Sequence, residues 1–221
     1  MFDRLDLLIG EEKRKELGSK KILLIGVGGV GSFTLEALIR SGILNITIVD
    51  GDVVDITNLN RQLIALKENV GMPKVEVAKK RALSINDEAH VNIINKFLTE
   101  DDLENLDYDY VIDATDDRPF KKALIKYCYN HKIKLISSMG MGKRFNPSMI
   151  EITDIHKTSY DPIARDIRAF CRSEGIKKLT VVSSKEKAKD IKAIGTFAPV
   201  PASAGLLIAS HVILDLLNLT V

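Results

Sequence analysis

The chain has 221 residues, of which 45% are hydrophobic and 28% are charged, and its net charge is +2. This size and balance predict one globular domain and exclude a disordered or fibrous protein, while so small a net charge creates no strong field toward nucleic acid or membranes. Two cysteines, Cys128 and Cys171, are too few for a disulfide framework or for paired Cys-x-x-Cys zinc ligands.

The N-terminal part alternates short apolar runs with stretches of helical spacing. Residues 20–25 predict a buried strand, and the glycine cluster that follows leads into a helix ending at Gly42. Thr99 and Asp102 form the pattern of a capping box for a short helix. The other elements predicted up to residue 138 are strands 45–50, 90–94, 110–113 and 133–138 and helices 74–85 and 119–131. This alternation predicts an α/β fold, Rossmann-like and doubly wound around a mostly parallel sheet.

The C-terminal part is less regular. Strands at 149–153 and 179–182, a helix begun by Asp161 and Pro162, a charged loop and an apolar helix at 202–217 are predicted. That last stretch carries His211 and Asp215 and is shorter than the roughly 20 residues of a spanning helix, so we expect it to be buried. We expect one domain over 1–221, with a nucleotide-binding core at 20–147 and a sheet extension and helix at 148–221. The N-terminus lacks the apolar region of a secretory signal, so we expect a cytoplasmic protein.

Four glycines, Gly26, Gly28, Gly29 and Gly31, form a G-x-G-G-x-G motif between the first strand and the first helix. Missing side chains let the backbone approach a phosphate, and the helix N-terminus favours its negative charge. Asp50 ends the next strand, about where an acid that holds ribose hydroxyls is expected. On this motif alone a dinucleotide-dependent dehydrogenase is the favoured interpretation, because that is its commonest use.

Polar and charged side chains after the second and fourth strands favour a different chemistry. They are Asn58, Asn60, Arg61, Gln62, Lys74 and Asp116. If ATP is attacked at its α-phosphorus, negative charge grows on the phosphoryl oxygens and on pyrophosphate, which an arginine and a lysine can offset. Asp116 can hold Mg²⁺ on the phosphates, whereas Asp113 can brace the loop. Taken singly, each charge has a simpler explanation as a surface residue or a helix cap.

The residues in order resemble the ThiF/MoeB/ubiquitin-activating superfamily, over 20 to about 117. The matching segments are GVGGVG, VDGDVVDITNLNRQ, VGMPKVEVAKKRALSIN and VIDATDD. The resemblance implies that ATP and Mg²⁺ bind and that a carboxylate is adenylated. It implies these ATP-site residues besides the glycines: Asp50, Asp52, Asn58, Arg61, Lys74 and Asp116. The opening MFDR resembles the superfamily's first motif, which implies a homodimer in which residues 1–19 contact the partner and Arg4 reaches the partner's ATP.

Within the superfamily, residues 122–168 look most like the tRNA threonylcarbamoyladenosine dehydratases, and DIHKTSYDPIARDIR is the most specific segment. This resemblance implies that ATP activates the threonylcarbamoyl carboxylate of a tRNA adenosine beside the anticodon, and that the acyl group then cyclises with loss of AMP. The attacking nitrogen and the activated carbonyl belong to one nucleoside, so proximity is built into the substrate.

Two other functions stay open at this stage. One is adenylation of the C-terminal glycine of a small ubiquitin-like sulfur carrier, with a carrier or a cysteine-desulfurase system as the partner. The other is an NAD(P)-dependent oxidoreductase. The absence of Cys-x-x-Cys pairs fits the dehydratase branch of the superfamily. Cys128 and Cys171 fall on apolar helical faces, so we expect both in the core rather than acting as nucleophiles.

A basic stretch is the candidate surface for the tRNA. Residues 165–192 hold nine Lys/Arg against four Asp/Glu. On composition alone, a solvated lysine-rich loop is the favoured explanation of this excess. The residues expected to contact phosphates of the anticodon stem-loop are Lys143, Arg144, Lys177, Lys178, Lys185 and Lys187.

Overall fold

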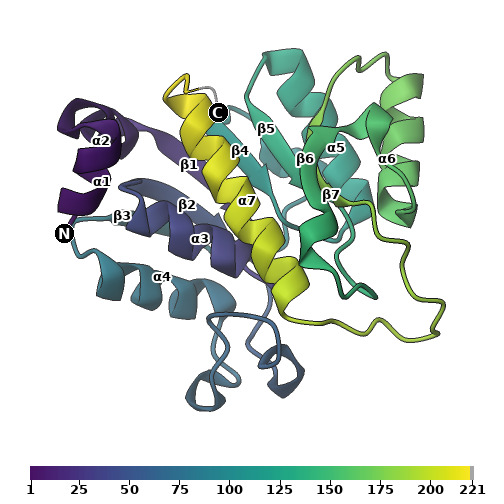
Figure 1. The fold of residues 1–221 in the computed structure, drawn as a ribbon, viewed down its shortest axis with the longest axis horizontal. Helices are drawn as coiled ribbons and strands as arrows, with labels where there is room; N and C mark the ends of the chain where they lie inside the picture. The colour runs from purple at the N-terminus through teal and green to yellow at the C-terminus, as the bar shows by residue number, and fades with distance from the viewer. Residues whose placement is uncertain (220–221) are drawn as a thin grey trace.

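The computed structural model describes residues 1–219, so the last two residues of the predicted 148–221 segment lie outside the description. A seven-stranded sheet in the order β3-β2-β1-β4-β5-β7-β6 forms the centre of the molecule (Figure 1). The strands are β1 (Lys21–Ile25), β2 (Asn45–Val49), β3 (His90–Ile94), β4 (Tyr110–Asp113), β5 (Leu135–Ser138), β6 (Ile150–Asp154) and β7 (Thr180–Ser184). The α-helices are α1 (Asp3–Ile9), α2 (Glu11–Ser19), α3 (Gly31–Arg40), α4 (Lys74–Ile85), α5 (Arg118–His131), α6 (Pro162–Ser173) and α7 (Pro199–Leu216).

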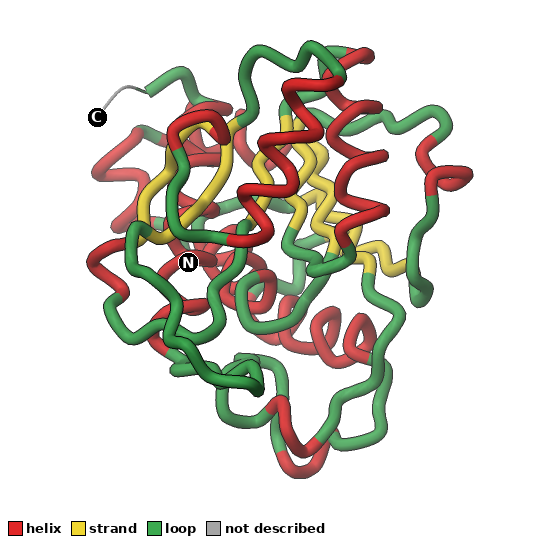
Figure 2. The backbone as a smooth tube through the Cα atoms, turned by 90° about the vertical axis from the view of Figure 1, so that its right-hand side faces the viewer, coloured by secondary structure: helices red, strands yellow, loops and turns green. Residues whose placement is uncertain are grey.

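Helices cover both faces of the sheet (Figure 2). Successive side chains of a strand point to opposite faces, and β1 is apolar on both. Ile22 and Leu24 pack with α3, α4 and α7, whereas Leu23 and Ile25 pack with α5 on the other face. This double burial explains why β1 has a continuous apolar run instead of alternating apolar and polar residues.

The predicted α/β fold is confirmed, including the parallel pairing of the first five strands. The capping box of Thr99 and Asp102 also forms, at the start of the 3₁₀ helix η3 (Glu100–Leu103). The order of the last two strands was not predicted. β7 inserts between β5 and β6, pairing parallel to β5 and antiparallel to β6. The C-terminal extension is therefore part of the same sheet.

Helix α7 packs against α3 and the sheet, as Figure 1 shows. It is long and apolar enough to cross a membrane by length and composition, but 44% of that stretch is buried inside the protein. Gly205 allows the close packing, since a Cβ atom there would lie 2.4 Å from the carbonyl oxygen of Val30. The hydroxyl of Thr34 donates to the carbonyl of Gly205 at 3.1 Å. The C-terminal helix thus fixes the start of α3, the helix that follows the glycine motif.

Candidate active site

A cavity of about 1180 Å³ opens at the carboxyl ends of the parallel strands. It lies beside the neighbouring strands β1 and β4, where the strand order reverses, which is the usual ligand position in open α/β sheets. Its wall includes the segments after β1, β2, β3, β4 and β5, the start of α6 and part of the segment between β7 and α7. The predicted nucleotide-site residues that line it are Gly26, Gly28, Gly29, Asp50, Asp52, Asn58, Arg61, Lys74 and Asp116.

The glycine loop leaves backbone donors available at the start of α3. A Cβ atom at Gly31 would lie 1.9 Å from the carbonyl oxygen of Gly26, so only glycine lets the helix begin this close to the strand. At Gly28 an added Cβ would meet nothing nearer than 3.7 Å. Among residues 1–219, nothing accepts a hydrogen bond from the backbone N–H groups of Gly28, Gly29 and Val30. Free N–H groups at a helix N-terminus form an anion site.

Asp50 joins the end of β2 to this loop. One carboxylate oxygen accepts a hydrogen bond from the backbone N–H of Val27 at 2.9 Å, and the other accepts from the N–H of Asp52, also at 2.9 Å. Each carboxylate oxygen has two lone pairs, so both oxygens can still accept from a hydroxyl in the cavity. The Asp50 carboxylate is therefore held in place and can still accept hydrogen bonds from a ligand in the cavity.

Lys74 is held at the cavity wall by an acid of the preceding loop. Its Nζ donates to Oδ2 of Asp52 at 2.7 Å, and its backbone N–H donates to the carbonyl of the same residue at 2.9 Å. The lysine side chain is buried, whereas the Asp52 side chain is half exposed. A bridge between Val53 and Pro73 fastens the two segments. The ammonium group is thus fixed beside the cavity before any ligand arrives.

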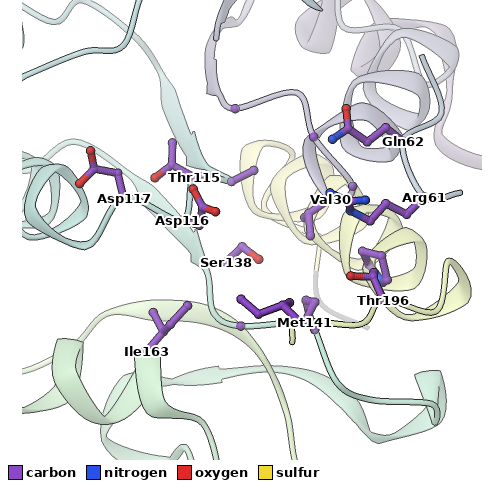
Figure 3. A pocket seen from close by; sticks show the side chains of 18 of the residues that line it. Val30, Arg61, Gln62, Thr115, Asp116, Asp117, Ser138, Met141, Ile163 and Thr196 are labelled. Carbon is purple, nitrogen blue, oxygen red and sulfur yellow. The ribbon is translucent and has the colours of Figure 1, made fainter. Parts of the chain in front are cut away.

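Arg61 follows the 3₁₀ helix η1 (Ile56–Asn58), which orients its side chain. One guanidinium nitrogen, NH1, donates to the carbonyl of Thr57 at 2.8 Å and to Oδ1 of Asn60 at 3.1 Å. Asn58 has a structural role, since it closes a capping box with Asp55 at the start of η1. Among the partners within residues 1–219, only NH1 of the five-donor guanidinium is engaged, so the other donors remain available. Figure 3 shows Arg61 on the cavity side opposite Asp116.

Gln62 adds an unsatisfied group to the cavity. Its side chain is buried and lines the cavity, and its amide oxygen has no hydrogen-bond partner within residues 1–219. A buried amide oxygen without a partner costs free energy, and a bound molecule with a donor would satisfy it. Gln62 stood in the predicted polar turn without an assigned role.

The two adjacent acids after β4 have different roles. Asp117 caps α5, because its Oδ1 accepts a hydrogen bond from the N–H of Phe120 at 3.1 Å. Asp116 is exposed at the cavity wall, and its carboxylate makes no hydrogen bond or ion pair with any residue in 1–219. Figure 3 shows Asp116 beside Ser138, with Asp117 turned to the other side. Of the two adjacent acids, Asp117 is therefore the helix cap and Asp116 is the acid that faces the cavity.

A buried charge pair underlies this loop. Lys121 and Asp113 are both completely buried, and the lysine Nζ donates to the carboxylate at 2.5 Å. The hydroxyl of Ser137 donates to the same carboxylate at 2.6 Å, and Thr115 donates to its other oxygen through both N–H and hydroxyl. The network fastens the ends of β4 and β5 and the turn that carries Asp116, which confirms that Asp113 braces the loop.

Sequence reasoning missed Lys121. A signal was present, because Ile125 and Cys128 follow it by four and seven residues on the buried face of α5. A lysine at this position on the apolar face of the helix is expected to be buried, and a buried lysine requires a carboxylate or other hydrogen-bond acceptor.

Arg144 does not have the position expected of a phosphate contact. Its guanidinium is buried and donates to the carboxylate of Asp161 at 2.9 Å and to the carbonyl of Glu186 at 3.0 Å. It also donates to the carbonyls of Gly140 and Gly142. These internal partners use the guanidinium to hold the cavity wall after β5, so the prediction that Arg144 contacts tRNA phosphates is corrected.

The predicted lysines do not form one surface. Lys177 and Lys178 are exposed just before β7, at the opposite end of that strand from the cavity. Lys185 and Lys187 follow β7 and are exposed on the cavity side. Lys143 lines the cavity, and its Nζ donates to the carbonyl of Ile191. The basic stretch of the sequence groups the other four lysines because they are close along the chain. In the structure, strand β7 separates Lys177 and Lys178 from Lys185 and Lys187.

Both cysteines lie in the core, as predicted, away from the cavity lining. Burial raises the pKa of Cys128 to about 12 and that of Cys171 to about 11. Thiols with such pKa values are almost entirely protonated near neutral pH, and a thiol is a far weaker nucleophile than a thiolate. Neither cysteine is suited to act as a nucleophile.

Arg4 lies on α1, outside the lining of the cavity in its own chain. Helix α2 leads into the amino end of β1, whereas the cavity is at the carboxyl end. Helix α1 also exposes Leu7 and Leu8, which are 88% and 82% accessible.

Comparison with known proteins places the chain among adenylating proteins. Residues 2–220 match the ThiF family. The tRNA threonylcarbamoyladenosine dehydratase of Bacillus subtilis is 44% identical over 240 residues, covering 98% of this chain and 94% of that protein. A molybdopterin-synthase adenylyltransferase of Haemophilus influenzae is 35% identical over 134 residues, covering 60% and 54%. The crystal structure of E. coli tRNA N6-threonylcarbamoyladenosine dehydratase, TcdA, in complex with ATP matches with a TM-score of 0.93 at 36% identity, covering 98% of this chain and 93% of that one.

Proposed function

This chain belongs to the ThiF family, and on that premise we propose that it is an ATP-dependent tRNA threonylcarbamoyladenosine dehydratase. A relative with this name aligns along almost the whole chain, and a structure of this name binds ATP in a matching fold. The feature of the chain itself that supports the proposal is the shared cavity. The glycine loop after β1, the cations Arg61 and Lys74 after β2, and the Asp116 carboxylate after β4, which has no partner in residues 1–219, line it together.

The reaction has two bond exchanges. The threonylcarbamoyl carboxylate attacks the α-phosphorus of ATP, forming an acyl-adenylate and releasing pyrophosphate. The carbamoyl nitrogen of the same nucleoside then attacks the activated carbonyl, AMP leaves, and the nitrogen gives up its proton. Both nucleophiles belong to the substrate, so the protein needs to position the groups and stabilise charge.

We assign the charge-stabilising roles to Arg61 and Lys74. Both line the cavity, and both are held by neighbouring groups before ligand binds. Preorganised cations stabilise charge that grows in a transition state without paying for their own reorganisation. The backbone N–H groups of Gly28 and Gly29 have no acceptor within residues 1–219 and can donate to phosphate oxygens, and Asp50 is placed to accept from ribose hydroxyls.

Asp116 is the acid that fits a magnesium ion on the triphosphate. Its carboxylate is exposed to the cavity and has no partner in 1–219, and carboxylate oxygen is a ligand type that Mg²⁺ prefers. Bound to ATP, Mg²⁺ would neutralise phosphate charge and orient the triphosphate. Asp52 is a poorer candidate ligand because it already holds Lys74.

The proposal is tested by AMP release. Purified protein is incubated with α-labelled ATP and, in separate reactions, anticodon stem-loop RNA carrying the threonylcarbamoyl group, the unmodified RNA, and a ubiquitin-like carrier ending in Gly-Gly. We expect AMP with the modified RNA alone. AMP with the carrier alone would instead assign the activity of the molybdopterin-synthase adenylyltransferase relatives, and AMP in none of the reactions would contradict the proposal.

The same assay tests the role of the lysines beside the cavity. Lys185 and Lys187 are exposed there, and each phosphate contact adds to the salt dependence of RNA binding. For about three such contacts, we expect the KM for RNA to rise roughly 10- to 100-fold between 50 and 200 mM salt. A KM for RNA that does not change with ionic strength would remove these lysines from the interface.

We further propose that Arg4 acts in a partner's cavity within a homodimer. It lies outside its own cavity, on a helix whose exposed Leu7 and Leu8 offer an apolar surface to a second copy. Arg4→Ala and Asp116→Asn should each be inactive alone. Co-expressed, they should regain about a quarter of wild-type activity, because half of the dimers then contain one complete site. Full activity of Arg4→Ala alone, or no recovery in the mixture, would contradict the arrangement.

A further inference from the structure

After β7 the chain leaves the sheet and returns to α7 through residues 185–198, which we call the outer strap. Figure 1 shows it as the long loop before α7. The strap is fastened to the segment after β5 by paired backbone bonds, from Lys189 N–H to the carbonyl of Lys143 and from Lys143 N–H to the carbonyl of Gly195, both at 2.8 Å. The Glu186 carboxylate accepts from the N–H groups of Phe145 and Asn146. The strap therefore has a defined position beside the cavity.

Two phenylalanine rings lie together on this surface. Phe145 and Phe197 are 57% and 45% exposed, and their ring centroids are 5.8 Å apart with the planes tilted by 43°. They come from different segments, the turn after β5 and the end of the strap, and the backbone bonds between those segments hold them side by side. Large aromatic side chains gain most by burial, so an exposed pair held in place is a candidate contact surface.

The surroundings of the rings are positively charged. The strap contains Lys187, Lys189 and Lys192, all exposed, against Glu186 and Asp190, and a fourth exposed lysine, Lys185, pairs with Glu151 of β6. The Glu186 carboxylate is already occupied by backbone donors, and Lys189 Nζ lies 6.0 Å from the Phe145 ring centroid. Aromatic faces among lysines suit a single-stranded nucleic acid, because bases stack on the rings while cations meet the phosphates.

The pair lies beside the cavity but does not line it. The lining includes Lys143 and Thr196, which are near neighbours of Phe145 and Phe197 in the chain, and neither ring is part of it. A base stacked on the rings is thus outside the space for ATP and the reacting nucleoside. We propose that Phe145 and Phe197 form a stacking platform for a nucleobase next to the reacting nucleoside in the anticodon loop. This inference rests on the proposed tRNA substrate.

The absence of tryptophan from the chain gives a direct test. Phe197→Trp places a single fluorophore in the platform, and a stacked base should quench it when anticodon stem-loop RNA binds. The control is Tyr129→Trp, at an exposed position near the end of α5, about 16 Å along the helix from the cavity-lining Arg118. We expect quenching in the first protein and none in the second, with RNA binding measured independently by anisotropy. Bound RNA without quenching of the platform tryptophan would overturn the inference.

Substitution tests the contribution to binding. Phe145→Ala and Phe197→Ala should each weaken RNA binding about 5- to 150-fold, as expected for loss of a base stack, while the Kd for ATP is unchanged. Phe145→Tyr and Phe197→Tyr should restore RNA binding, since the ring is kept. An abasic nucleotide beside the modified one should weaken wild-type binding and make it insensitive to Phe197→Ala. Unchanged RNA binding in both alanine variants would overturn the inference.

Failure of this inference is distinguishable from failure of the proposed function. If wild-type protein releases AMP with the modified RNA but the platform variants bind RNA normally, the function stands and the platform is wrong. A second copy of the chain covering the rings would also overturn the proposal. It would be recognised by tryptophan emission in Phe197→Trp that shifts to shorter wavelength with protein concentration and does not respond to RNA.

Discussion

Asp116→Asn should lower the rate of AMP formation by about 10²- to 10³-fold while leaving the fold intact, the scale seen when one preorganised charge-stabilising group is removed. The carboxylate is exposed to the cavity and makes no contact within 1–219 that holds the protein together, so its loss removes a ligand group and nothing structural. Asparagine is nearly isosteric but carries no charge for a cation. We expect kcat to fall and the Mg²⁺ concentration for half-maximal rate to rise, both measured by AMP release.

Asp117→Asn is the matched control. The two acids are adjacent, but Asp117 accepts a hydrogen bond from Phe120 N–H as the cap of α5. Asparagine caps helices about as well as aspartate, and loss of the charge beside the helix N-terminus costs only about 0.3–1 kcal/mol of stability. AMP formation in Asp117→Asn should therefore stay within a few-fold of wild type. Equal losses in the two variants would show that the loop, rather than the Asp116 carboxylate, matters.

Lys121→Met should destabilise the protein by about 3–5 kcal/mol, because it leaves the buried carboxylate of Asp113 without its counter-charge. That cost is a large part of the roughly 5–15 kcal/mol that holds a typical domain folded. The measurement is the free energy of unfolding from denaturant titration followed by circular dichroism. Activity should fall as well, because the network positions the turn that carries Asp116.

The neighbouring lysine provides the control. Lys122 pairs with Asp166 at 2.9 Å on the surface, with both side chains about a third exposed, and such pairs contribute about 0–1 kcal/mol. Lys122→Met should therefore change stability little. Adding Asp113→Asn to Lys121→Met should recover about 1–3 kcal/mol, since the uncompensated charge is then gone. A Lys121→Met protein as stable as Lys122→Met would mean that the buried pair is not the constraint described here.

Two buried ion pairs hold the edges of the cavity in place. Lys121 with Asp113 fixes the turn after β4, and Arg144 with Asp161 fixes the turn after β5 to the start of α6. Asp161 also caps that helix through Ala164 N–H. Neither pair is expected to contact substrate. Their physical effect is to keep the groups that do so in one arrangement before the ligand arrives, which favours electrostatic stabilisation.

Local patterns in the sequence were enough for most of the fold. Continuous apolar runs such as Ile22–Ile25 indicate strands that are buried on both faces. Glycines between a strand and a helix indicate a phosphate-binding turn. Both patterns could be recognised because they depend only on residues that are neighbours in the sequence. The prediction of a tRNA substrate came from the resemblance to a known family. The convergence of Arg61, Lys74 and Asp116 on one cavity also followed from order along the chain, since parallel strands end at the same edge.

Tertiary structure alone decided which charges are free and which are internal. The sequence gives no reason to distinguish Arg144 from Lys187, yet Arg144 is enclosed by Asp161 and backbone carbonyls while Lys187 is exposed. The pairing of Phe145 with Phe197 likewise joins residues far apart in the chain. Burial and partners are properties of packing between distant segments, and the insertion of β7 between β5 and β6 sets that packing. No local sequence pattern predicts these contacts, because the strand order depends on interactions throughout the sheet.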